Sequence, residues 1–286
     1  MMYTGEIVRP MDRRIKLIAL DMDGTLLTDG KSIRPDTAAD IAWAASRGVH
    51  VVYGSGRSYA ELSPYTASLP QMRYAVCASG SAVYDLREKR CIYAETIPIE
   101  TVRAIIETAG EDAGMFNFLT DSELIIRKKD LPYMKDFQMG VYQSLYERVG
   151  RTVDSMLQEC ASHDGIGKVN IYFRNKPDRE HYLALLQHLP VTFVRSEETS
   201  LEMTSPGVSK AKGLRALAAH LGVAMEETAA VGDSMNDLTM LREAGVAVAM
   251  GNAGEEVKAV CDFVTKDNNH NGVGLAIRKL LEEPYI

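Results

Sequence analysis

Two aspartates, Asp21 and Asp23, follow the apolar segment Ile15–Leu20 and are separated by a single residue. In an extended segment, side chains two positions apart point to the same side, so both carboxylates can converge on one point. Two carboxylates held close together repel each other, and one of them resists ionisation unless a cation sits between them. The pair therefore predicts either a shared proton or a metal site at the end of a strand.

A second acidic cluster lies late in the chain, where Asp233 ends the apolar stretch that begins at Thr228. Asp237 follows four residues later, about one helical turn, so both side chains can face the same way. Carboxylate oxygens with no histidine or cysteine nearby favour a hard cation such as Mg²⁺. Each motif alone is typical of a turn or a helix cap, and the joint occurrence of both at strand ends indicates chemistry.

Apolar runs that end in short polar motifs recur in the first part of the chain. Residues 15–20 end in the aspartate pair, residues 49–53 end in GSGR, and residues 74–78 end in SGSA. A helix is expected over residues 36–46, between the first two runs. Continuous apolar strands alternating with helices predict an α/β fold with a parallel sheet, whose ligands bind at the carboxyl ends of the strands.

The middle of the chain has a different rhythm, in which strands follow one another with few helices between them. We expect helices over 98–110 and 177–189 and a hairpin over 115–128. The α/β alternation returns near the end, starting with a helix over 209–221. These patterns predict an inserted α+β domain at residues 86–190, between core segments at residues 1–85 and 191–286.

The composition argues against several classes of protein. With a net charge of −7 and an isoelectric point of about 5.5, the chain is not expected to bind nucleic acid. No apolar run approaches the roughly 18 residues of a membrane span, so we expect no membrane association. The four cysteines lie far apart without a C-x-x-C pair, which favours reduced thiols and a cytoplasmic location over disulfides or a zinc site.

Four segments in this order, DMDGTLL, GSGR, GVSK and GDSMND, resemble the motifs of the haloacid dehalogenase superfamily of phosphatases. The inserted module resembles the cap of the Cof-like, type IIB branch. The resemblance implies a Rossmann-like core with an inserted cap. It also implies a Mg²⁺-dependent phosphatase that hydrolyses small phosphorylated metabolites, such as sugar phosphates, through an aspartyl-phosphate intermediate.

The resemblance also implies a role for each motif residue. Asp21 would be the nucleophile, and Asp23 would be the general acid and then the general base. Magnesium would be held by the Asp21 side chain, the Asp23 backbone carbonyl and Asp233, with Asp237 orienting these ligands from behind. The phosphate oxygens would be bound by the Met22 and Gly56 backbones, the Ser55 hydroxyl, the Asn236 side chain and the Lys210 ammonium.

Three positions leave alternatives open. Lys210 and Lys212 both lie in GVSKAKG, and the spacing to the following LRAL segment favours Lys210 as the phosphate-site lysine. Arg57 either lies near the site or forms a structural ion pair. Ser79 stands where this branch often has asparagine, so a substrate contact from that position is in doubt.

The cap would choose the leaving group, because a lid excludes water and supplies substrate contacts. A phosphomutase or another phosphotransferase is an alternative activity, and a non-catalytic phosphate-ligand binder is an alternative function on the same scaffold. A small phosphorylated metabolite is the expected partner, and a homodimer is possible. The residues considered for substrate contacts in the cap are Asn117, Asp121, Lys168, Asn170 and Tyr172.

Overall fold

The larger sheet is built from both ends of the chain. The computed structural model describes residues 15–282, and its eight-stranded sheet has the order β16-β15-β14-β1-β2-β3-β4-β5. Neighbours from β16 to β3 are parallel, whereas β4 and β5 are added antiparallel. The strands are β1 (Leu17–Leu20), β2 (His50–Gly54), β3 (Tyr74–Cys77), β4 (Ala82–Asp85), β5 (Arg90–Ala94), β14 (Thr228–Gly232), β15 (Val246–Ala249) and β16 (Phe263–Val264).

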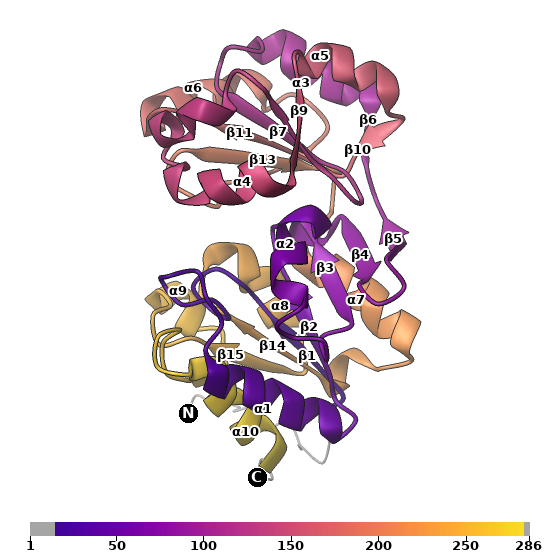
Figure 1. Cartoon of the computed structure of the whole chain (residues 1–286), viewed down its shortest axis with the longest axis vertical. Coiled ribbons are helices and arrows are strands. Elements are labelled where there is room, and N and C mark those ends of the chain that lie inside the picture. Colours follow the sequence, from indigo (N-terminus) through magenta and orange to yellow (C-terminus); the bar gives the residue numbers. More distant parts are fainter. Residues whose placement is uncertain (1–14, 283–286) are drawn as a thin grey trace, which may run out of the picture.

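Helices cover both faces of this sheet, which explains why its central strands are apolar throughout (Figure 1). Ile18 and Leu20 of β1 pack in a core cluster with α1, α2 and α10, and Leu17 and Ala19 pack in a second cluster with α7, α8 and α9. The helices are α1 (Pro35–Ser46), α2 (Tyr59–Thr66), α7 (Lys210–Leu221), α8 (Leu238–Glu243), α9 (Glu255–Lys258) and α10 (Gly272–Glu282).

A second sheet of six strands, in the order β12-β13-β11-β7-β8-β9, forms the cap above the core (Figure 1). All its pairs are antiparallel except β8 and β9. Its strands are β7 (Met115–Leu119), β8 (Leu124–Arg127), β9 (Gly150–Val153), β11 (Lys168–Tyr172), β12 (Thr192–Val194) and β13 (Ser200–Thr204). The cap helices are α3 (Ile99–Ala109), α4 (Gln143–Val149), α5 (Met156–Glu159) and α6 (Lys176–Leu186).

The two faces of the cap sheet differ in chemistry, because alternate residues of a strand point to opposite faces. Val169 and Ile171 of β11 pack in a core cluster with residues of α3, α5 and α6. Lys168 and Asn170 of the same strand line a cavity above the core aspartates. One face of the cap sheet is therefore apolar and covered by α3, α5 and α6. The other face directs the polar side chains of β11 at the core, beside a second apolar cluster that β7 and β8 form with α4.

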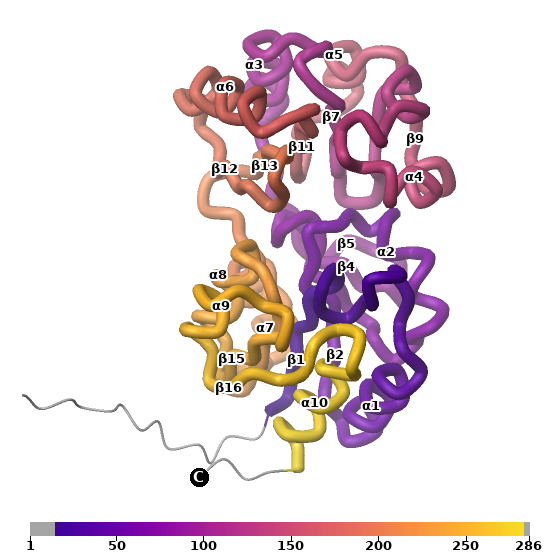
Figure 2. The backbone as a smooth tube through the Cα atoms, turned by 90° about the vertical axis from the view of Figure 1, so that its left-hand side faces the viewer, coloured from indigo at the N-terminus to yellow at the C-terminus, as the bar shows by residue number. Residues whose placement is uncertain are grey.

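Two segments of the chain connect core and cap (Figure 2). They lie between β5 and β6 (Ile97–Pro98) and between β13 and α7. Both connections lie later in the chain than the predicted boundaries at 85/86 and 190/191, since β5 ends at Ala94 and β13 ends at Thr204. The physical reason is strand pairing: β5 extends the core sheet by pairing with β4, and β13 belongs to the cap sheet because it pairs with β11 and β12.

The elements expected from sequence are otherwise present, including the hairpin of β7 and β8 and the helices α1, α3, α6 and α7. None of the helices in residues 15–282 is long and apolar enough to cross a membrane. The four cysteines are free. The remaining elements are β10 (Gly165–Ile166), which pairs with β6, and the 3₁₀ turns η1 (Ala78–Gly80), η2 (Leu131–Phe137), η3 (Gly140–Tyr142), η4 (Cys160–Ser162), η5 (Met225–Glu227) and η6 (Met235–Asp237).

Helix α7 begins in close contact with the η1 turn. Gly80 has a φ of +99°, and a Cβ atom there would lie 1.9 Å from the carbonyl oxygen of Ser209. Ser209 is the N-cap of α7, and its hydroxyl accepts a hydrogen bond from the Lys212 backbone N–H at 3.2 Å. A residue without a side chain at position 80 therefore allows α7 to start where Lys210 reaches the strand ends.

We predict that Gly80→Ala destabilises the protein far more than Gly48→Ala does. Gly48 also has a positive φ, +79°, but no atom of residues 15–282 lies within 4 Å of a Cβ built there. Gly48→Ala should cost about 1–2 kcal/mol for backbone strain alone, and Gly80→Ala should cost at least about 3 kcal/mol because the clash is added. Urea unfolding measures both, and equal losses would contradict the close approach.

Candidate active site

Adjacent parallel strands bring the two predicted acidic motifs together. Asp21 follows β1 and Asp233 follows β14, and these strands are neighbours in register, with Leu20 opposite Val231. The Asp21 backbone N–H donates a hydrogen bond to the Val231 carbonyl at 3.0 Å, which extends the ladder to the aspartate itself. Both carboxylates therefore lie at the carboxyl end of the sheet, as the sequence predicted.

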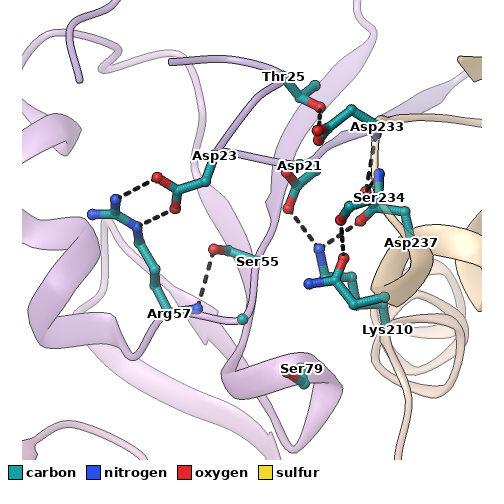
Figure 3. A network of polar contacts seen from close by, with 12 residues as sticks. Asp21, Asp23, Thr25, Ser55, Arg57, Ser79, Lys210, Asp233, Ser234 and Asp237 are labelled. Atoms are coloured by element: carbon teal, nitrogen blue, oxygen red, sulfur yellow. Dashed lines mark hydrogen bonds and ion pairs between the residues drawn. The ribbon is translucent and has the colours of Figure 1, made fainter. Parts of the chain in front are cut away.

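Lys210 lies between two carboxylates (Figure 3). Its Nζ donates to Asp21 Oδ1 and to Asp237 Oδ1, each at 2.6 Å, and all three side chains are buried. Lys212 instead forms an ion pair with Glu95 at the surface of the core. The structure thus brings Lys210, and not Lys212, to the nucleophile candidate.

Asp237 also holds the loop after β14 in place. Its Oδ2 accepts hydrogen bonds from the backbone N–H groups of Asp233 and Ser234, both at 3.1 Å. A carboxylate bonded to two backbone donors and one ammonium has a fixed orientation. Asp237 therefore positions Asp233 and Lys210 at once.

Carboxylate oxygens of Asp21, Asp233 and Asp237 lie within 4.8 Å of one another, which is close enough for one ion to contact all three. Within the described part of the chain, the ion pairs to these carboxylates come from Lys210 alone. Three carboxylates opposed by one ammonium leave two negative charges uncompensated. A divalent cation with oxygen ligands matches both the charge and the donor atoms, so the residues present fit Mg²⁺.

The pKa values of Asp21 and Asp233 are both raised, by burial first and by neighbouring negative charge second. Burial is the largest cause for Asp21, followed by the charge of Asp237, and together they hold its pKa well above the usual value despite Lys210. Burial and the charge of Asp237 raise the pKa of Asp233 to about 6, although the Thr25 hydroxyl donates to its Oδ1 at 3.1 Å. The cluster is therefore short of positive charge.

Asp23 points away from this cluster and is bound by two cations (Figure 3). Arg57 donates from Nε to Oδ2 and from Nη2 to Oδ1, both at 2.8 Å, and Lys31 Nζ donates to Oδ1 at 2.6 Å. Burial alone would raise the pKa of Asp23, but the hydrogen bonds and charge of Arg57, with those of Lys31, lower it to about 2. Asp23 is therefore ionised in this structure.

Arg57 thus lies in the site and forms an ion pair there, so both alternatives considered from sequence hold. Its guanidinium lies 5.5 Å from the ring centroids of Tyr65 and Tyr142, the latter a cap residue. The Tyr142 hydroxyl also accepts a hydrogen bond from Lys31 at 3.3 Å. Arg57 Nη1 is buried without a hydrogen-bond partner in residues 15–282, so one donor beside Asp23 is free for a ligand.

The predicted phosphate-binding residues surround the same space. Ser55 and Gly56 follow β2 and line a cavity together with Asn236, Asp21 and Asp23. The Ser55 hydroxyl accepts a hydrogen bond from the Arg57 backbone N–H at 3.1 Å, and the Asn236 side chain accepts one from Ser234 at 2.7 Å. Met22 has a fully buried side chain, so only its backbone could contact a ligand.

The cap closes the cavity, whose volume is about 230 Å³, from above. Lys168 Nζ donates to the Gly56 carbonyl at 3.1 Å and to Ser79 Oγ at 3.0 Å, and it pairs with Glu202 at 2.6 Å. Ser79 therefore contacts the cap rather than open space. Sequence analysis missed Lys31, Glu202 and Tyr142 at this site, because they lie in segments without a motif and only tertiary packing places them here. It also gave no role to Thr25, which lies within the DMDGTLL motif and donates to Asp233.

Comparisons with known proteins agree with this geometry. A family model described as haloacid dehalogenase-like hydrolase matches residues 18–277. Phosphatase YwpJ of Bacillus subtilis is 29% identical over 287 residues, which cover 93% of this chain and 100% of that protein. Pyridoxal phosphate phosphatase YbhA of Escherichia coli is 27% identical over 260 residues, covering 90% and 96%. A haloacid dehalogenase-like hydrolase structure from B. subtilis superposes with a TM-score of 0.82 at 28% identity, covering 93% and 100%.

An acidic cluster at parallel strand ends, beneath an inserted cap, defines a hydrolase of phosphoric monoesters. The chain belongs to the haloacid dehalogenase-like hydrolases. The family and the fold class expected from the sequence are thereby confirmed.

We predict that Lys210→Ala lowers kcat/KM for an aryl phosphate at least about 100-fold, whereas Lys212→Ala changes it less than about threefold. Loss of the Lys210 ammonium leaves Asp21 and Asp237 facing each other without a counter-charge, whereas Lys212 bonds only at the surface. Steady-state kinetics of the two variants measure the difference. Normal turnover by the Lys210 variant would show that the phosphate-site lysine has been misassigned.

Proposed function

We propose that this protein is a Mg²⁺-dependent phosphatase that hydrolyses small phosphorylated metabolites through an aspartyl-phosphate intermediate on Asp21. The observation that carries this proposal is the charge imbalance of the acidic cluster. A deficit of two positive charges beside a nucleophile candidate suits a divalent cation and a phosphate ester. Magnesium, when bound by Asp21, Asp233 and the Asp23 backbone carbonyl, would neutralise charge on the phosphate.

Asp21 would supply the attacking oxygen. Its Oδ1 accepts from Lys210, which fixes the carboxylate and opposes its protonation. A bond forms between a carboxylate oxygen and phosphorus while the bond from phosphorus to the ester oxygen breaks. Water then attacks the same phosphorus, which releases inorganic phosphate and restores Asp21. Ser55, Gly56 and Asn236 line the cavity where the phosphoryl oxygens would lie, and Lys210 is bonded to Asp21 at its edge.

Asp23 would protonate the departing alcohol and then accept a proton from the attacking water. As an ionised partner of Arg57 and Lys31 it cannot donate a proton, so its ion pairs must change when substrate is bound. The free Nη1 of Arg57 offers a route, because a phosphate placed beside it competes with Asp23 for the guanidinium. Once its ion pairs are weakened, Asp23 would take up a proton from solvent and then pass that proton to the departing alcohol oxygen.

A phosphotransferase would use the same nucleophile, with a second alcohol in place of water. A protein that only binds phosphate ligands would not need Asp23. The presence of both Asp21 and Asp23 therefore favours an enzyme. The relatives act on compounds as different as pyridoxal phosphate and 5-amino-6-(5-phospho-D-ribitylamino)uracil, judging by their names. We place this enzyme among phosphatases of small metabolites. A cytoplasmic location and a possible homodimer remain predictions from the sequence.

We predict that hydrolysis of an aryl phosphate requires added Mg²⁺ and stops when the metal is chelated. Binding should also raise the thermal unfolding midpoint of the wild type, since a ligand at 100 times its Kd adds about 2.7 kcal/mol. Asp233→Asn should lose most of this shift because it removes one carboxylate of the cluster. Full activity after exhaustive chelation would rule out the metal.

We predict that Asp23→Asn slows the hydrolysis of an alkyl phosphate more than that of a nitrophenyl phosphate, by at least about tenfold. Nitrophenolate leaves without a proton, whereas an alkoxide needs one. Single-turnover rates of Asp21 phosphorylation with both esters give the comparison. A uniform slowdown for both leaving groups would argue against the acid role of Asp23.

A further inference from the structure

A row of polar side chains crosses the cap sheet on the face that looks toward the core. Asn170 of β11 lies opposite Asn117 of β7 and opposite Glu202 of β13 in the antiparallel register. Residues directly opposite each other in such a sheet point to the same face. Asn117, Asn170 and Glu202 therefore form one row, which we call the amide row, on the face of the cap sheet that is directed at the core.

The amide row is buried, yet two of its oxygens have no partner. Asn117 is 0% and Asn170 is 3% exposed, and neither Oδ1 has a hydrogen-bond partner within the described residues. Leaving a buried polar group unsatisfied costs about 1–3 kcal/mol. Glu202 differs, because its carboxylate accepts from Lys168, Ser79 and Ser196.

Asn170 is the member of the pair that reaches the active-site cavity. It lines the cavity together with Asp21 and Asp23, whereas Asn117 lies behind Tyr146, to whose hydroxyl it donates at 3.0 Å. Lys168, the neighbouring cavity residue on β11, is already occupied by Gly56, Ser79 and Glu202. Asn170 Nδ2 donates to the Tyr172 hydroxyl at 3.3 Å, which leaves Oδ1 as a buried acceptor without a partner on a residue that lines the cavity.

We propose that Asn170 is a specificity-determining residue whose side-chain carbonyl accepts a hydrogen bond from a hydroxyl group of the leaving alcohol. This proposal rests on the phosphatase function proposed above. The surrounding wall supports a hydroxylated leaving group, because the hydroxyls of Tyr146 and Tyr172 line the same cavity and a substrate hydroxyl can pair with such groups as donor or as acceptor. A leaving group with its own carboxylate or second phosphate would meet Glu197 and Glu202 instead and be repelled.

Pairs of esters with equal carbon chains test the proposal. Glycerol 3-phosphate is compared with propyl phosphate, and sorbitol 6-phosphate with hexyl phosphate, so that each pair differs in hydroxyl groups. For the wild type we expect kcat/KM to favour the polyol ester by at least about tenfold in one pair or both. In Asn170→Leu, which keeps the approximate shape but removes the acceptor, that ratio should fall at least about tenfold.

Asn117→Leu is the matched control. It removes an equally buried amide from the next strand without removing a group that lines the cavity, so its ratio should stay within about threefold of wild type. The unfolding midpoint separates a binding role from a structural one. Because Asn170→Leu removes an unsatisfied buried oxygen, its midpoint should equal or exceed that of the wild type while the substrate preference is lost.

The proposal is overturned if Asn170→Leu leaves the ratio of kcat/KM between polyol and alkyl esters unchanged. It is also overturned if this ratio falls equally in Asn170→Leu and Asn117→Leu, or if the wild type shows no preference for polyol esters. Hydrolysis of nitrophenyl phosphate separates a failure of the Asn170 assignment from a failure of the proposed phosphatase function. If that ester is hydrolysed but the polyol preference is absent, the assignment of Asn170 fails and the phosphatase function stands. If no ester is hydrolysed in the presence of Mg²⁺, the proposed function fails and the assignment of Asn170 fails with it.

Discussion

The active site depends on the electrostatics of three carboxylates and one ammonium that are buried together. Asp21, Asp233 and Asp237 come from two strand ends and a 3₁₀ turn, and Lys210 comes from the start of α7. Burying like charges at this separation is unfavourable unless positive charge is added. Lys210 supplies one charge, and the remaining deficit is what a divalent cation and its ligands can satisfy. The parallel pairing of β1 with β14 and the close contact of Gly80 with α7 both hold this cluster in place.

The cap contributes a second set of constraints. Its sheet is apolar where α3, α5 and α6 cover it and presents the polar side chains of β11 where it faces the core, so substrate contacts can vary without disturbing the cap's own core. Lys168 and Glu202 form a buried pair on the cap, and Lys168 also bonds to the Gly56 carbonyl on the core. The loop after β2 is therefore oriented in part by the cap, which links cap position to the geometry of the phosphate site. Tyr142 makes a similar link to Arg57 and Lys31.

Sequence patterns predicted the parts of the site that depend on local structure. The alternation of apolar runs and helices predicts parallel strands, and such strands place Asp21 and Asp233 at one edge whatever the details of packing. Lys210 could be chosen over Lys212 because its spacing to the LRAL segment matches the pattern of the family that the sequence resembles. The domain joints could not be located, since β5 and β13 look like neighbouring strands in sequence and only pairing partners assign them. Lys31 and Glu202 reach the site through tertiary packing, which leaves no periodic signal.

The central claim is that Asp21 accepts the phosphoryl group. An aspartyl-phosphate is reduced by borohydride to homoserine, so treating the enzyme with borohydride during turnover and sequencing its peptides by mass spectrometry locates the modified residue. The account predicts homoserine at position 21 when substrate and Mg²⁺ are both present, and none without substrate or in Asp21→Asn. Turnover accompanied by an unmodified Asp21, or by reduction of a different carboxylate, would contradict it.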